Sequence, residues 1–267
     1  MQRTAALILA LACPIASFAG ADAAPRGATT ASASAGSVDT PVRQLQVMMG
    51  LDGNDWTLLQ ETPAVMRWRT PEGILVVLSA HEREPDLLPI LSDPVRSRDY
   101  FRAQAHKHGG GLVEAEVRKT PGITYDLATD KYKLGDLFPQ SNDHVTNAYA
   151  LTATFPLEAV FGEITLIARE GSPTGMREAL VATARHFHEP PLDMAMPQHD
   201  PYDARFDAGA TYMDSDAREW DRVLPQHPLS TIRTLMPRLL AKSRLPGVSE
   251  SVAAELSAGA AASAATR

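Results

Sequence analysis

The sequence predicts an α+β fold, in which a largely antiparallel sheet carries two packed helices in the order βββ-α-ββββ-α. Three observations lead to this prediction. Short apolar or alternating segments, typical of strands, occur in two groups with one helical segment between them. Turns that contain proline or glycine separate neighbouring strands. Residues 161–190 then read as a strand, a turn and an amphipathic helix, which completes the set.

The first group contains three predicted strands, at residues 56–59, 65–69 and 74–80. Pro71-Glu72-Gly73 is the predicted turn between the second and the third. Residues 74–78 are apolar on both faces, which indicates a strand in the interior of the sheet. The segment at residues 42–49, ahead of this group, is compatible with a short helix or a strand.

The first helix is predicted after Ser92-Asp93-Pro94, because a polar cap residue there precedes a proline at the first helical position. Three glycines at residues 109–111 end it. The second group of predicted strands covers residues 112–119, 123–127, 149–155 and 163–169.

The second helix is predicted to begin at Ser172-Pro173 and to end at Pro190-Pro191. Leu166 of the preceding strand is predicted to face this helix. The apolar stripe expected to face the sheet consists of Met176, Ala179, Leu180, Thr183, Ala184 and Phe187. Residues 171–175 allow two interpretations, an anion-binding loop or a tight connection. The second is favoured, because no lysine follows and no strict glycine fingerprint is present.

This order of elements resembles the PsbP-like family across about residues 51–188, together with the triple-glycine helix stop and the hairpin around Pro121-Gly122. That family is named for an extrinsic subunit of photosystem II and includes secreted bacterial proteins and a small-GTPase-binding import factor. The resemblance implies a non-enzymatic binding or adaptor role. It implies no particular site residue, because none can be matched.

The first 23 residues are typical of a bacterial secretory signal peptide, with Arg3, a short apolar run and small residues before the cleavage site. A lipoprotein site at Cys13 is disfavoured by the residues around it. The mature chain would then contain no cysteine and lie in the periplasm or outside the cell. No later stretch is long and apolar enough to predict a transmembrane segment. Residues 24–41 are interpreted as a flexible linker.

The remaining chain divides into an α+β sandwich domain (42–190), an acidic Pro/Asp-rich extension (191–228), a basic amphipathic helix (229–246) and an Ala/Ser-rich tail (247–267), expected to be a frayed helix. Without the signal, 24 basic and 31 acidic residues give a net charge of −7. No basic run is present, so nucleic-acid binding is not expected. Residues 189–221 alone contain nine acidic and two basic residues.

The basic helix carries an apolar stripe that consists of Leu229, Ile232, Met236, Leu239 and Leu240. Its bases are Arg233, Arg238, Lys242 and Arg244. Such a helix can dock on an anionic membrane surface or on the acidic segment of its own chain. We favour the intramolecular arrangement, because an acidic segment precedes the helix and Pro237 interrupts a long interfacial stripe.

No catalytic, cofactor-binding or metal-binding residue is predicted. The pairs His106/His108 and His186/His188 place their rings on different sides of a helix, and the aspartates around His199 lack EF-hand spacing. Glu163 and Glu170 could supply the two carboxylates of a glycoside hydrolase, but a regular strand directs them to opposite sides. The sequence therefore favours a secreted or periplasmic non-enzymatic binding or adaptor protein with a protein or cell-envelope partner. The alternative is an extracytoplasmic hydrolase without a recognisable motif.

Export is the first testable consequence. The tripartite N-terminus predicts that N-terminal sequencing of the exported protein begins near Asp22 or Ala24. A mature chain that still starts at Met1, or one that carries lipid on Cys13, would contradict the prediction.

Overall fold

A computed structural model describes residues 40–82, 87–138, 141, 143, 145–158, 160–186 and 214–265 of the 267-residue chain. The predicted signal peptide, most of the linker, Phe187 and most of the acidic extension lie outside these residues.

Seven strands form one sheet in which every neighbouring pair is antiparallel, in the order β1-β2-β3-β7-β6-β5-β4. Their bounds are β1 Thr57–Glu61, β2 Val65–Arg69, β3 Leu75–Glu82, β4 Gly111–Lys119, β5 Thr124–Lys133, β6 Asn147–Pro156 and β7 Val160–Arg169. The α+β class and the βββ-α-ββββ-α order are confirmed. β7 is the central strand, which agrees with its apolar residues on both faces.

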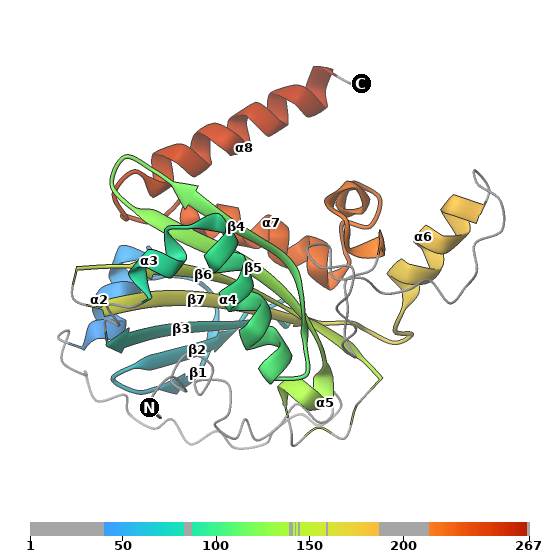
Figure 1. Cartoon of the computed structure of the whole chain (residues 1–267), viewed down its shortest axis with the longest axis horizontal. Helices are drawn as coiled ribbons and strands as arrows, with labels where there is room; N and C mark the ends of the chain where they lie inside the picture. Colours follow the sequence, from blue (N-terminus) through green and yellow to red (C-terminus); the bar gives the residue numbers. More distant parts are fainter. Residues whose placement is uncertain are drawn as a thin grey trace.

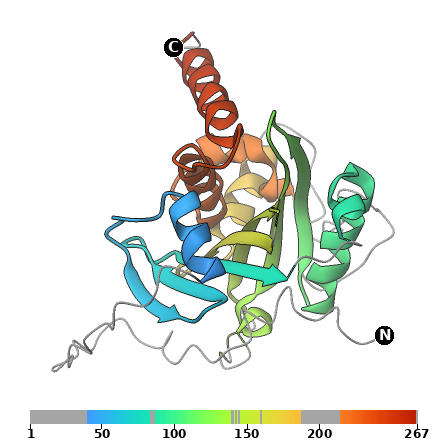
Figure 2. The same ribbon diagram turned by 90° about the vertical axis from the view of Figure 1, so that its left-hand side faces the viewer.

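Helices lie on both faces of the sheet, as the edge-on view in Figure 2 shows. They are α2 Pro41–Met48, α3 Leu88–Leu91, α4 Pro94–Lys107, α5 Leu134–Leu137, α6 Met176–His186, α7 Pro228–Leu240 and α8 Val248–Ala265, with 3-10 turns η1 Asp214–Asp216 and η2 Arg218–Arg222. We call the sheet face beneath α2 and α7 the α7 face. The opposite face, which carries α4, is the α4 face.

The largest apolar cluster lies on the α7 face. Ile164, Leu166 and Ala168 of β7 point into it, together with residues of α2, α7 and the start of α8. Every member of the stripe predicted for residues 229–240 is buried there, so this stripe is not available to a membrane. The helix therefore docks within the chain, but its stripe packs on the sheet and not on the acidic segment, which contributes the ion pair of Asp221 with Arg233. Leu166 is buried as predicted, but its helical neighbours come from α7 and α2 and not from α6.

The α4 face carries two smaller apolar clusters. Phe101 of α4 packs with Ala128 of β5 and Phe161 of β7, and α5 covers the other end of the same face. The predicted start of α4 is confirmed, because the Asp93 carboxylate accepts hydrogen bonds from the backbone N–H groups of Val95 and Arg96 at 2.9 and 3.1 Å.

Two predictions about helices are wrong. The helix after β7 begins at Met176 and not at Pro173, and Met176 and Leu180 of its predicted buried stripe are exposed. Its buried residues are instead Arg177 and Val181, because this helix contacts polar groups of η1 and η2. A helix is present in the Ala/Ser-rich tail as predicted: α8 covers Val248–Ala265 and extends away from the body (Figure 1). None of the helices in the described ranges is both long and apolar enough to cross a bilayer.

The packing of α7 predicts the effect of truncating its stripe. Ile232→Ala should lower the free energy of unfolding by about 2–5 kcal/mol, because a fully buried side chain leaves a cavity against the sheet. Urea denaturation measures this change. Leu256→Ala on the exposed part of α8 is the matched control and should change stability by less than about 0.5 kcal/mol. Equal effects of the two variants would contradict the observed docking.

Candidate functional site

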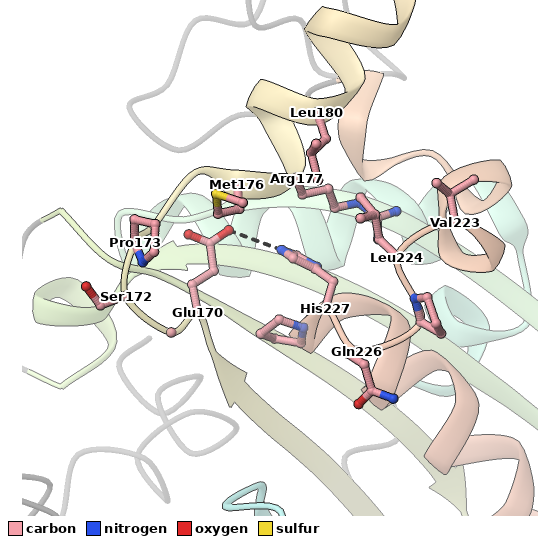
Figure 3. Close-up of a pocket in the computed structure, with 13 residues that line it drawn as sticks. Glu170, Ser172, Pro173, Met176, Arg177, Leu180, Val223, Leu224, Gln226 and His227 are labelled. Atoms are coloured by element: carbon pink, nitrogen blue, oxygen red, sulfur yellow. Dashed lines mark hydrogen bonds and ion pairs between the residues drawn. The ribbon is translucent and has the colours of Figure 1, made fainter.

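A pocket of about 440 Å³ lies where β7 ends, where α6 begins and where the chain enters α7 (Figure 3). Its lining is mostly apolar: Pro173, Met176, Leu180, Val223, Leu224, Pro225 and Pro228. The polar side chains that line it are Glu170, Ser172, Arg177, Gln226 and His227. This volume lies within the range usual for ligand pockets in proteins.

The Glu170 carboxylate is the most heavily hydrogen-bonded group of the pocket. Its two oxygens accept bonds from five donors in three parts of the chain. These are Asn147 Nδ2 (3.2 Å), Tyr149 OH (3.4 Å), Thr174 Oγ1 (2.5 Å), the Gly175 backbone N–H (3.1 Å) and His227 Nε2 (3.2 Å). Burial alone would raise the pKa of Glu170, but the bonds from His227, Thr174 and Gly175 outweigh it and hold that pKa at about 2.

His227 is fixed from two sides. Its Nδ1 accepts the backbone N–H of Leu229 at 3.3 Å, which makes His227 the N-cap of α7. Because Nδ1 is then an acceptor, the neutral ring carries its proton on Nε2 and donates it to Glu170. The ring also meets the edge of Tyr149, with the ring centroids 5.4 Å apart. The pair in Figure 3 is therefore a structural clasp between β7 and α7.

The turn at residues 171–175 was predicted to be either an anion-binding loop or a tight connection, and its hydrogen bonds distinguish the two. Its Gly175 N–H, just before the start of α6, is occupied by the Glu170 carboxylate of the same chain. The negative charge that a helix N-terminus favours is thus supplied from within. The observed geometry is the tight connection that the sequence favoured.

Arg177 forms the wall of the pocket on the α6 side, and its side chain is 0 % exposed. Its guanidinium donates to the carbonyl oxygens of Ser215 and Ala217, to Ser230 Oγ at 2.7 Å and to Asp221 Oδ1 at 2.9 Å. A buried arginine is stable only when it is paired and hydrogen-bonded in this way. Arg177 therefore joins α6, the segment 215–221 and α7.

Further ion pairs continue from this wall across the sheet. Lys131 of β5 binds Glu178 at 3.0 Å and Asp216 at 3.2 Å, and Arg233 of α7 binds Asp221 at 3.3 Å. Arg233 and Arg218 also bind Glu114 of β4, and these two cations hold the pKa of Glu114 below its usual value against the effect of burial. The acids at the end of the predicted acidic extension are thus docked on bases of the folded domain.

Glu163 lies on the α4 face and Glu170 beside the α7 face, so the sequence prediction of opposite sides is correct. The Glu163 carboxylate contacts Thr154, Ser79 at 3.5 Å and His81 at 3.2 Å. One ring nitrogen of His81 faces both Ser79 and Glu163, whereas a catalytic relay uses the two nitrogens for different partners. Ser79 is also buried. This cluster does not form a nucleophile relay.

Among the described residues, no three His, Cys, Asp or Glu side chains gather in a way that could hold a metal ion. His106 and His108 are among the residues that the structure describes, whereas His188, His199, Asp200 and Asp203 are not. Sequence reasoning named Glu170 only as a possible hydrolase carboxylate, and it missed His227 and Arg177. One signal was available for His227, its position directly before the proline that starts α7.

No protein-family model matches this chain, and no curated protein sequence matches it. The geometry of the pocket is therefore the basis for inferring its role. Its carboxylate accepts five hydrogen bonds and its guanidinium donates four, so both groups hold the fold together and are poorly placed to transfer a proton to a substrate. The exposed part of the site is mostly apolar, with Ser172 and Gln226 as its exposed polar residues.

Replacing Glu170 should reveal its contribution to stability. A pKa lowered from 4.5 to about 2 means that the ionised group stabilises the fold above about pH 4.5 and loses this effect as the pH falls towards 2. Glu170→Gln should therefore lower the free energy of unfolding at pH 7 by about 3 kcal/mol and flatten the acid limb of the stability profile. Urea titrations at several pH values measure this, with Glu72→Gln in an exposed turn as control. An unchanged acid limb would contradict the assigned role of Glu170.

Proposed function

We propose that this chain is a non-enzymatic binding protein of the cell envelope, and that the pocket beside Glu170 takes up an apolar segment of a protein partner. The observation that supports the proposal is a division within the pocket. Glu170 and Arg177 are engaged in hydrogen bonds with other parts of the protein, while Met176, Leu180 and Val223 remain exposed.

Three large apolar side chains around the pocket are open to solvent. Met176 is 50 %, Leu180 46 % and Val223 64 % exposed. They come from α6 and from the segment before α7, so they lie on two sides of the pocket (Figure 3). Covering such side chains removes apolar surface from contact with water, and this removal is the main driving force of association. Met176 is also flexible enough to adapt to different partner side chains.

A protein segment suits this surface better than a small molecule. A small apolar ligand would fill the hollow and leave the outer surfaces of Leu180 and Val223 in water. A segment that inserts one apolar side chain and lies across the rim would cover both regions. The contact between Glu170 and His227 also supports this arrangement, because it holds the two sides of the pocket at a fixed separation before a partner binds.

Hydrolysis is the alternative function. A general base is most effective when its pKa is close to the working pH, and the pKa of Glu170 is about 2. The envelope location rests on the predicted signal peptide and is part of the proposal. It fits the binding role that the PsbP-like resemblance implies.

Site-specific photo-crosslinking in cells that export the protein tests this proposal. A photoreactive apolar amino acid at Leu180 should give a discrete crosslinked protein adduct. The same residue at Thr234, on the exposed side of α7, should not. Because Val223 is exposed, Val223→Ser should reduce the Leu180 adduct at least several-fold without lowering the urea midpoint.

Equal crosslinking at Leu180 and Thr234, or an adduct insensitive to Val223→Ser, would contradict the pocket as a partner site. Hydrolysis of envelope glycans or peptides by the purified protein, lost in Glu163→Gln or Glu170→Gln, would favour the hydrolase instead.

A further inference from the structure

The helix α4 lies on a strand that presents two buried carboxyl groups. Residues Ser97, Phe101 and Ala105 of α4 are buried at four-residue spacing, which makes them its inner face. On the α4 face of the sheet, β5 presents Asp126, Ala128 and Asp130 at two-residue spacing.

The two spacings match. Four residues of a helix and two residues of a strand each advance by about 6 Å. Ser97 Oγ donates to Asp126 Oδ1 at 2.5 Å, and Phe101 packs with Ala128 in one apolar cluster. The third position, Ala105, is therefore placed at the level of Asp130. An alanine offers Asp130 no hydrogen bond.

Both carboxyl groups are incompletely satisfied. Asp126 is 0 % and Asp130 8 % exposed, and among the described residues Asp126 Oδ2 and Asp130 Oδ1 have no hydrogen-bond partner. Burial raises the pKa of Asp126 to about 7 and that of Asp130 to about 8, although hydrogen bonds from Ser97 and Tyr132 act in the opposite direction. A buried carboxylate oxygen without a hydrogen-bond partner costs free energy, whereas the neutral acid is tolerated in the same environment.

The groups around the two carboxyls supply little compensating charge. Opposite Asp126 lie Val117 of β4 and Thr154 of β6, and opposite Asp130 lie Leu112 and Ala150. The charged residues of α4 nearest to Ser97 in sequence are Arg96, Arg98, Asp99 and Arg102, and the Asp99 carboxylate contacts both Arg98 and Arg102. Those nearest to Ala105 are His106, Lys107 and His108 at the end of α4, and no charged group is among the causes that shift the pKa of Asp130. Glu163 with His81 follows Thr154 along the same row of the sheet, and Tyr132 lies two residues beyond Asp130.

We propose that α4 is a pH-responsive cover of this sheet face, held in place by the neutral acid forms of Asp126 and Asp130 and loosened when both ionise. Loosening exposes the apolar side chains beneath it, those of Leu112, Ala128 and Phe161.

The raised pKa values determine whether a rise in pH strengthens or weakens the docking of α4. A carboxyl group whose pKa in the folded protein exceeds the unfolded value stabilises the docked state fully below about pH 4. That stabilisation decreases as the pH rises through about 7 for Asp126 and about 8 for Asp130. The cover is thus closed in acid and loosened in alkali.

Hydrogen exchange on the full chain from about pH 5 to about pH 9 tests the proposal. The readout is the protection factor of α4 amides, corrected for the intrinsic rate, relative to that of α7 amides in the same sample. It should fall by up to about tenfold per pH unit for each of the two groups from about pH 5 up to the raised pKa of that group, and it should level off above about pH 8. The double variant Asp126→Asn/Asp130→Asn carries neutral side chains of the same shape and should show no pH dependence. Asp99→Asn, at an exposed position on α4, is the control and should retain the wild-type slope.

A constant ratio of α4 to α7 protection in the wild-type protein would overturn the proposal, as would an unchanged slope in the double variant. Should the double variant fail to fold, NMR titration of the side-chain carboxyl carbons in the wild-type protein decides the matter. Two aspartate signals that titrate near pH 7 to 8 and disappear in the single variants support the cover. Titration of both groups near the ordinary value of about 4 refutes it.

Discussion

The Glu170 carboxylate is the contact on which the second half of the molecule depends. It lies one residue beyond the central strand and receives hydrogen bonds from β6, from the turn before α6 and from the N-cap of α7. A buried carboxylate with this many donors is strongly directional, so it determines where α6 starts and where α7 enters. The pocket exists because these two entry points are held apart.

The sheet could be predicted because its information is local. Alternation in β5 and β6, the apolar run in β3 and the turn at Pro71-Glu72-Gly73 each specify one element, and antiparallel neighbours follow from short connections. The stripe of α7 was equally readable. The buried face of α6 was not. Arginine is usually exposed to solvent, so the sequence gives no reason to expect Arg177 to be buried. The groups that bind it lie 38 to 53 residues later in the chain. Their proximity is a property of the tertiary fold.

The candidate site was unpredictable for the same reason. Glu170 and His227 are 57 residues apart, and neither belongs to a motif with a fixed spacing. The sequence did place Glu163 and Glu170 on opposite sides of the strand, because the period of a β-strand is a local property. It could also recognise the turn at residues 171–175 as a possible anion site. It could not show that the anion is the protein's own carboxylate, since this depends on the fold of the turn.

The two faces of the sheet use buried carboxyl groups in opposite ways, and this difference has a consequence for the whole molecule. On the α7 side, donors outnumber the carboxylate oxygens of Glu170, so ionisation is favoured and the contact strengthens as the proton leaves. On the α4 side, Asp126 has one donor and Asp130 lies opposite an alanine, so ionisation is opposed. Acid therefore weakens the side that carries the pocket, and alkali weakens the side beneath α4. Between roughly pH 4.5 and pH 7 Glu170 is ionised and keeps its full stabilising effect, whereas the stabilisation from the two neutral aspartates decreases as the pH rises towards their raised pKa values. A change of external pH would consequently act on one face at a time, and the central strand β7, whose residues contribute to the cores of both faces, would remain folded.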